Sequence, residues 1–188
     1  MQVRELLEKY VPYNEQEDND KKIMLKYIDC FDDVLTRNNE FGHFTASSWV
    51  VNKEKTKVLM IYHNIYNSWS WTGGHADGEV NLLNTAVREL KEETGVKNVK
   101  ILNENIFSLE VVCVDGHMKK NKYVPSHVHL NLTFLFEVDE NEETRIKDDE
   151  NSGVKWINIE DVGNVVSEKW IFDNIYRKLN EKLKRQFS

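Results

Sequence analysis

Three carboxylates recur at helical spacing near the middle of the chain, at Glu89, Glu92 and Glu93. Positions i, i+3 and i+4 of a helix lie on neighbouring parts of one face, so three like charges would be crowded there. Hard divalent cations relieve such crowding because they prefer several carboxylate and carbonyl oxygens as ligands. The spacing therefore favours a site for Mg²⁺, with Mn²⁺ as the other candidate. A solvated acidic face, paired with Arg88 and Lys91, explains the same residues without a metal.

The carboxylates belong to a segment that predicts a helix over Leu82 to Thr94. Its apolar residues recur every three or four positions, and it stops at Gly95, a common residue at the left-handed end of a helix. The preceding loop, Trp71 to Gly78, holds three glycines in eight residues. Glycine lets the backbone approach a ligand or metal closely and leaves its amides and carbonyls available for binding.

Loop and helix together resemble the box of the Nudix hydrolase family, G-x5-E-x7-R-E-U-x-E-E-x-G-U, in which U is aliphatic. A box that begins at Gly74 places seven residues as the pattern requires: Arg88, Glu89, Leu90, Glu92, Glu93, Gly95 and Val96. The departure is Val80, which stands where the first box glutamate belongs, while Glu79 lies one residue earlier. This departure leaves open whether Glu79 braces the loop instead. The flanking segments also resemble Nudix strand entries, so the resemblance spans about Gly42 to Asp161.

The resemblance implies an α/β fold, a Nudix-type α/β/α sandwich around a mixed β-sheet. It also implies that the carbonyl of Gly73 and the carboxylates of Glu89, Glu92 and Glu93 coordinate the divalent metal. Arg88 would orient one of these carboxylates. The general base is either Glu89 or a residue of a later loop before a strand that contains tryptophan, where Glu150 precedes Trp156.

Four further residues are candidates for contact with the substrate: His75, Trp71, His127 and His129. His127 and His129 alternate along an expected strand, so both face the same side, where they would touch phosphate or metal. An ordinary packed or surface role is the alternative, since imidazole suits softer metals than magnesium. Trp71 offers an aromatic face for a nucleobase, although large aromatic residues more often serve packing.

The rest of the pattern predicts a Nudix domain with additions at both ends. We expect an N-terminal helical extension over residues 1–40 and a Nudix domain over residues 41–188 that includes a C-terminal helix. The acidic run Asp139 to Glu150 is expected to be a solvated loop. The individual elements expected are helices at Val3 to Tyr10, Asp20 to Thr36 and Lys169 to Lys184, and strands at Phe44 to Val51, Lys57 to Tyr62, Ile106 to Val114, His127 to Val138 and Val154 to Ile159.

The net charge of −7 argues against a nucleic acid polymer or a membrane surface as partner, because phosphate-rich partners attract basic surfaces. No apolar run reaches the length of a signal peptide or membrane span, and we expect a cytoplasmic protein. Cys30 and Cys113 follow no metal-ligand spacing and are expected to be packed, reduced thiols. A small phosphorylated substrate is the expected partner, and the added helices are candidates for a homodimer interface.

The leading hypothesis is a pyrophosphohydrolase that cuts a phosphoanhydride in a nucleoside diphosphate linked to another group, or in a similar small molecule. The first alternative is a non-catalytic ligand sensor, suggested by Val80 and the added helices. A second is an isoprenoid diphosphate isomerase, which shares the scaffold but uses a cysteine near the box loop, where this chain has Gly73 and Gly74. A purely partner-binding role would leave the carboxylate cluster unexplained.

Overall fold

The computed structural model describes residues 2–119 and 121–187. These residues divide into two compact units, each assembled from separate stretches of the chain. Unit 1 contains Met1–Ser47, Gly73–Ala86 and Glu104–Phe134, and unit 2 contains Ser48–Thr72, Val87–Asn103 and Leu135–Ser188. Among the described residues no helix combines the length and the apolar character that crossing a membrane requires.

Two helices open unit 1, as the sequence predicts: α1 (Val3–Lys9) and α2 (Glu15–Cys30). The expected start of the second helix at Asp20 is wrong, because the side chain of Asn14 accepts a hydrogen bond of 3.0 Å from the amide of Glu17. Asparagine is a strong N-cap, so the helix begins at Glu15. It also ends earlier than expected, since Phe31 is already extended.

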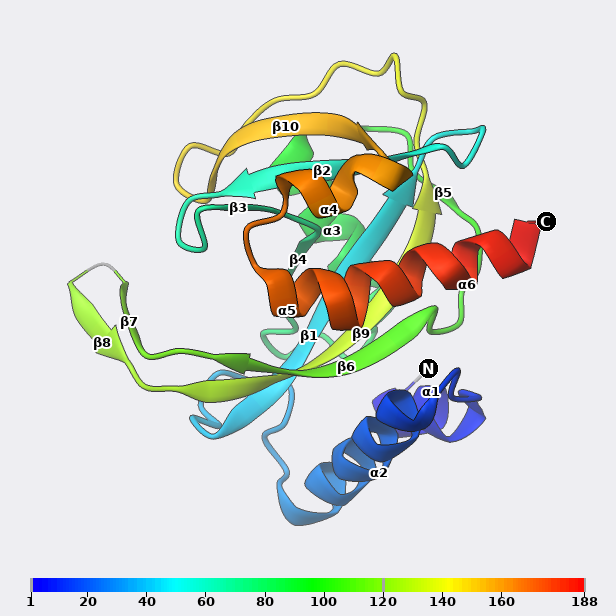
Figure 1. Ribbon diagram of the computed structural model, residues 1–188. Coiled ribbons are helices and arrows are strands. Elements are labelled where there is room, and N and C mark those ends of the chain that lie inside the picture. Colours follow the sequence, from blue (N-terminus) through cyan, green and yellow to red (C-terminus); the bar gives the residue numbers. More distant parts are fainter. Residues whose placement is uncertain (1, 120, 188) are drawn as a thin grey trace. The chain divides into compact units, whose positions relative to one another are not determined.

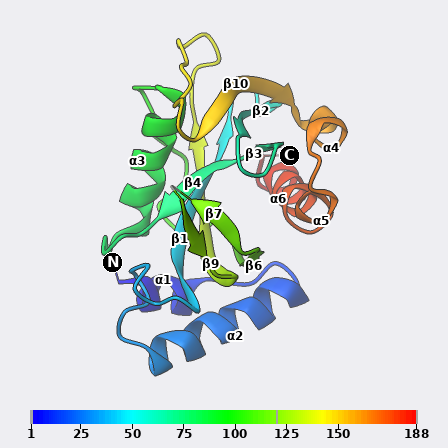
Figure 2. The same ribbon diagram turned by 90° about the vertical axis from the view of Figure 1, so that its left-hand side faces the viewer.

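Glu17 links the N-terminal helices to a strand of unit 1 through hydrogen bonds. Its carboxylate is fully buried and accepts hydrogen bonds from the Tyr10 hydroxyl at 2.5 Å, the Tyr13 amide at 2.7 Å and the Ser108 hydroxyl at 2.8 Å. A buried carboxylate is tolerated only with such partners. The helix that carries it, α2, packs against β6 (Ser108–Val114), as Figure 2 shows.

The strands of unit 1 centre on β9 (His127–Glu137). β6 pairs with it antiparallel, from Ser108 opposite Thr133 to Val114 opposite His127. The chain between them forms a two-stranded ribbon of β7 (His117–Lys119) and β8 (Lys122–Val124), visible in Figure 1. These short strands, like β4 (Thr72–His75) beside β1 (Gly42–Val51), were not predicted. Both free cysteines of unit 1 are exposed, so the expectation of packed thiols is wrong.

The last residues of β1 and β9 belong to unit 2, where the strand order is β10-β2-β1-β9-β5, with β3 also paired to β2 (Figure 1). Its further strands are β2 (Lys57–His63), β3 (Ser68–Ser70), β5 (Lys100–Ile101) and β10 (Asn151–Asn158). The expected hairpin between β1 and β2 is confirmed. The side-chain oxygen of Asn52 holds its turn by accepting from the amides of Thr56 at 2.9 Å and Lys57 at 3.0 Å.

Helix α3 (Leu82–Thr94) has the predicted bounds, and Gly95 follows it with a φ of 77°. Only glycine adopts this left-handed conformation without strain. The fully buried apolar residues of the helix are Leu82, Ala86 and Leu90.

The C-terminal helix of unit 2 also exists, although it is less regular than expected. It runs through α5 (Lys169–Ile171), a π-helical stretch η2 (Phe172–Tyr176) and α6 (Arg177–Phe187) (Figure 1). A 3₁₀ turn, η1 (Ile159–Asp161), and a short helix, α4 (Val162–Val165), precede it.

Candidate active site

The three box carboxylates differ in burial within α3. Glu89 is 8% exposed and Glu93 is 2% exposed, whereas Glu92 faces solvent. The metal-free alternative, in which the carboxylates lie on a solvated helix face, therefore holds for Glu92 but not for Glu89 and Glu93. A helix that places two carboxylates out of water on its packed side needs a compensating charge there.

Glu89 interacts with charged residues on the helix and on the later loop. The guanidinium of Arg88 lies 2.7 Å from its carboxylate and 3.7 Å from that of Glu92. Burial raises the pKa of Glu89; Arg88 and Lys147 act in the opposite direction, and the charges of Glu92 and Glu150 add to the increase. Arg88 thus contacts one of the box carboxylates, and its orienting role stays a prediction.

Lys147 joins the later loop to the box helix of unit 2, a contact the sequence analysis missed. Its ammonium lies 3.4 Å from the carboxylate of Glu92 and 3.0 Å from that of Glu150. The structure therefore places Glu150, the second candidate base, in the electrostatic neighbourhood of Glu89 and Glu92. No local pattern signals such a contact, because Lys147 and Glu92 are 55 residues apart.

The acidic run is a loop without a buried residue, as expected, but it is bonded to the end of the box helix. The amide of Arg145 donates to the carbonyl of Thr94 at 2.7 Å, and the side-chain amide of Asn151 donates to the carbonyl of Glu93 at 2.9 Å. Both acceptors are among the last carbonyls of α3, which have no partner inside the helix. The loop is thus attached to the helix end.

These three carboxylates have the chemistry that a hard divalent cation prefers, but among the described residues their oxygens do not gather within 4.8 Å of one another. Glu89 and Glu93 are held out of water one helical turn apart, Glu92 lies beside them, and nearby cations already balance part of the charge. Mg²⁺ and Mn²⁺ prefer carboxylate oxygens of this kind.

The box loop of unit 1 departs from the family pattern at Val80, and the neighbouring Glu79 makes a local contact. Val80 is 56% exposed, while the carboxylate of Glu79 accepts a hydrogen bond of 2.8 Å from the amide of Asn81. The side chain of Asn81 in turn accepts from the amide of Leu83 at 3.2 Å, at the start of α3. Glu79 therefore contacts the segment that leads into the helix, and its substitution for the first box glutamate stays a prediction.

Two further contacts hold this loop within unit 1. A Cβ atom on Gly73 would lie 2.6 Å from the carbonyl oxygen of Ala46 and from the hydroxyl of Ser47, so only glycine fits. Further on, the guanidinium of Arg37 binds both carboxylate oxygens of Asp77, at 2.8 and 2.9 Å. Bidentate pairs of this geometry are among the stronger surface contacts.

Four histidines of unit 1, His43, His75, His127 and His129, form a cluster. One nitrogen each of His43, His75 and His129 lies within 4.8 Å of the others, and Nε2 of His127 is 3.1 Å from Nε2 of His129. Burial lowers the pKa of His43, and burial together with the neighbouring imidazoles lowers that of His129 to about 2. The sequence pattern indicated His75, His127 and His129 but not His43, whose only signal was its place at the start of a strand.

Comparison with known proteins decides the family, because the NUDIX domain model matches residues 42–179, most of the chain. The chain belongs to the NUDIX family. The resemblance seen in the sequence and the expected Nudix fold, with helices added at both ends, are confirmed.

Relatives of this Nudix chain include hydrolases of phosphorylated molecules. An RNA pyrophosphohydrolase from Pelagibacter ubique (strain HTCC1062) is 30% identical over 139 residues, which cover 72% of this chain and 87% of the relative. Among solved structures, a NUDIX family hydrolase from Clostridium perfringens is 24% identical with a TM-score of 0.55, covering 77% of this chain and 97% of the other. A C. elegans Ap4A hydrolase is 19% identical with a TM-score of 0.53, covering 76% and 96%. The expectation of an enzyme with pyrophosphohydrolase relatives is confirmed.

Trp71 lies in unit 2 of the Nudix chain, where its ring packs edge-on against Tyr176 at 5.3 Å between centroids. Its amide also donates to the Tyr176 hydroxyl at 3.2 Å. These contacts show a packing role, and the predicted contact with substrate stays a prediction.

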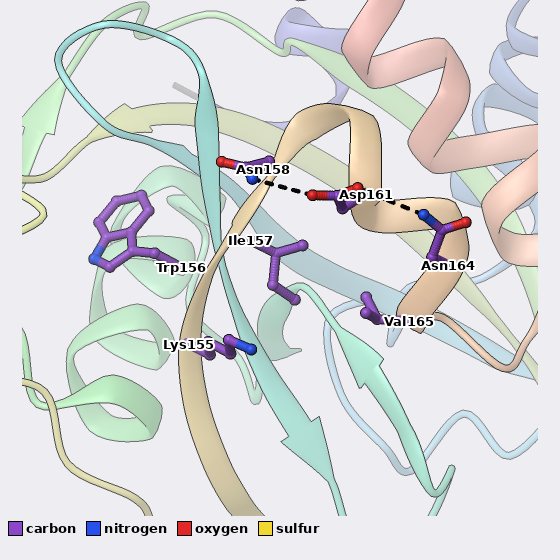
Figure 3. Close-up of a pocket in the computed structure, with 7 residues that line it drawn as sticks. All are labelled: Lys155, Trp156, Ile157, Asn158, Asp161, Asn164 and Val165. Atoms are coloured by element: carbon purple, nitrogen blue, oxygen red, sulfur yellow. Dashed lines mark hydrogen bonds between the residues drawn. The ribbon is translucent and has the colours of Figure 1, made fainter.

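A hollow of about 290 Å³ lies elsewhere in unit 2, between β10 and α4 (Figure 3). Ile157 and Val165 point towards each other across it, and Asp161 accepts hydrogen bonds from Asn158 at 3.0 Å and Asn164 at 3.5 Å. Since none of the box carboxylates lines it, this hollow is separate from the Nudix chemistry.

Proposed function

We propose that the chain hydrolyses a phosphoanhydride bond in a nucleoside diphosphate linked to another group, or in a similar small molecule, with Mg²⁺ or Mn²⁺. The observation that carries this proposal is the burial of Glu89 and Glu93 on the box helix. Burying two carboxylates costs stability, and a cation that binds them recovers it. A binding module has no need of a complete carboxylate set.

Glu89, Glu92 and Glu93 would hold the ion, and the box pattern also assigns the carbonyl of Gly73 to it. When bound, a divalent ion neutralises charge on the phosphates and lowers the pKa of a bound water. Arg88 keeps Glu89 in place through its 2.7 Å ion pair.

The base that takes a proton from water is Glu150 or Glu89. Glu150 is about one-third exposed and lies 3.0 Å from Lys147, which limits the directions its carboxylate can take. A partly exposed, positioned carboxylate is suited to accepting a proton from an attacking water.

Substrate contacts are proposed for Trp71, through its aromatic face, and for His75, His127 and His129.

The proposal also includes an N-terminal extension over residues 1–40, a Nudix domain over residues 41–188, a cytoplasmic location and a homodimer. A small substrate is preferred over a nucleic acid polymer because of the net charge of −7.

An RNA with a terminal phosphoanhydride is the second candidate substrate, since a relative at 30% identity is an RNA pyrophosphohydrolase. Such an RNA contains the same type of bond as the small substrate, but the acidic enzyme would have to bind a long polyanion.

The test is release of phosphate or nucleoside monophosphate by wild-type protein from a panel of substrates, each with Mg²⁺, Mn²⁺ or EDTA. The panel contains nucleotide sugars, dinucleoside polyphosphates, nucleoside triphosphates and a short 5′-triphosphorylated RNA. We expect metal-dependent turnover of a small compound. Turnover of RNA alone would replace the first candidate with the second, and thermal stabilisation by one compound without any turnover would contradict hydrolysis in favour of a sensor.

A further inference from the structure

We propose that His43, His75 and His129 of unit 1 bind a divalent transition-metal ion of the zinc type, with His127 at the edge of the site. The three side chains come from three strands, β1, β4 and β9, and one nitrogen of each lies within 4.8 Å of the others. Nitrogens bound to one zinc ion at about 2.0–2.1 Å lie at most roughly 4.2 Å apart. Side-chain shifts of less than ~1 Å would therefore complete the site.

His43 presents a lone pair rather than a proton to this cluster. Its Nδ1 lies 3.1 Å from the carbonyl of Asn39, and a carbonyl only accepts, so Nδ1 carries the proton. Nε2 therefore keeps its lone pair. The residue is only 4% exposed, and Nε2 has no hydrogen-bond partner among the described residues. A ring nitrogen fixed by a backbone carbonyl, with the opposite nitrogen aimed inward, is the usual arrangement of a metal-binding histidine.

The adjoining histidine shows the same arrangement. Nδ1 of His127 donates to the carbonyl of Pro125 at 2.9 Å, which leaves a lone pair on Nε2. That atom lies 3.1 Å from Nε2 of His129. Without an ion, Nε2–H of His129 donates a hydrogen bond to this lone pair, so Nε2 of His129 binds an ion only when its proton moves to Nδ1.

The lone pair on His43 favours a metal over a phosphate, the two contacts predicted for His127 and His129. A phosphate oxygen accepts hydrogen bonds and would meet the inward lone pair of His43 with repulsion. Arg37, the arginine among the charges that act on His43, is already paired with Asp77. Imidazole ligands suit zinc, nickel, cobalt and copper rather than magnesium, so this site and the carboxylate site select different ions.

The decisive experiment is zinc binding by metal-stripped full-length protein, measured by competition with a chromophoric chelator in saturating Mg²⁺. We expect one zinc ion per chain. His43→Gln and His129→Gln should each weaken binding by at least about tenfold. His63→Gln, which changes a histidine of unit 2, should bind as wild type does. Absence of zinc binding by the wild type, or equal affinity in His129→Gln, would overturn the proposal.

Cobalt provides a second, spectroscopic measurement, because a nitrogen-ligated Co²⁺ ion of low coordination number absorbs visible light strongly. We expect this absorption in the wild type and in Glu93→Gln, and its loss in His129→Gln. Loss in Glu93→Gln with retention in His129→Gln would place the ion on the carboxylates and refute the histidine site. Because Glu93→Gln tests hydrolysis separately, either proposal can fail alone.

Discussion

The side-chain amide of Asn151 donates a 2.9 Å hydrogen bond to the main-chain carbonyl of Glu93. Asn151 is the first residue of β10 and is 1% exposed. Its side-chain oxygen accepts from the amide of Lys147 at 3.3 Å, so one residue ties both the helix end and the loop of Lys147 and Glu150 together. The position of the candidate base in unit 2 therefore depends on Asn151.

Asn151→Ala should destabilise the protein by about 1–3 kcal/mol, because it leaves a buried carbonyl unsatisfied. It should also lower kcat, since Glu150 loses its support. Chemical denaturation and turnover measure the two effects. Asn141→Ala, at an exposed position of the same loop, is the matched control and should change stability by less than about 0.5 kcal/mol. Unchanged stability of Asn151→Ala would contradict the bond.

Lys147→Gln should strengthen Mg²⁺ binding up to roughly fivefold, because exposed ion pairs contribute ~0.2–1 kcal/mol and Lys147 competes with the metal for Glu92 and Glu150. Calorimetric titration with Mg²⁺ measures the change, and Lys155→Gln on β10 serves as control. Weaker Mg²⁺ binding would instead mean that Lys147 assembles the site.

Glu89→Gln should stabilise the metal-free protein at pH 7 while lowering turnover by about 100-fold or more. Burial raises the pKa of Glu89, so the folded state favours its neutral form. The wild type therefore has its full stability below the ordinary pKa near 4.5 and loses some as the pH rises through the folded pKa. Melting curves in EDTA from pH 4 to pH 8 should show the stabilisation by glutamine only at the higher values. If Glu89→Gln were less stable than the wild type at pH 7, burial of the ionised carboxylate would not destabilise the folded protein.

Glu137→Gln should show the opposite dependence on pH. Hydrogen bonds from Lys55 and Lys100 lower the pKa of Glu137, so its contribution exists above the ordinary pKa near 4.5 and disappears as the pH falls through the folded pKa. We expect a loss of about 1 kcal/mol at pH 7, and no difference from wild type near pH 3. Denaturant titrations at both values test this. A loss that persists in acid would point to packing rather than charge.

The sequence predicted elements whose stabilising residues are close together in the chain. Helix α3 has a periodic apolar face and a terminal glycine, so both of its ends were predicted. The start of α2 was missed because its N-cap, Asn14, lies before the periodic apolar residues begin. Strands β3 and β4 are three and four residues long and rich in serine and glycine, and tertiary pairing rather than propensity creates them.

In the candidate active site, too, only contacts between residues close together in the chain could be predicted. Arg88 and Glu89 are adjacent in sequence, so their pairing was open to prediction from the box resemblance. Lys147 reaches Glu92 only through the folded loop, and His43 meets His129 only when strands far apart in the chain are brought together. Contacts of this kind depend on topology, which residue spacing alone does not define.

The most direct test of the hydrolase is Mg²⁺-dependent turnover by Glu93→Gln beside Glu143→Gln, with the best substrate of the panel. Both variants remove one carboxylate charge, but Glu93 is buried on the box helix whereas Glu143 is an exposed residue of the acidic run. With folding verified by circular dichroism, we expect turnover to fall by about 100-fold or more in Glu93→Gln and to persist in Glu143→Gln. Wild-type turnover in folded Glu93→Gln would contradict a metal site built on the carboxylates of α3.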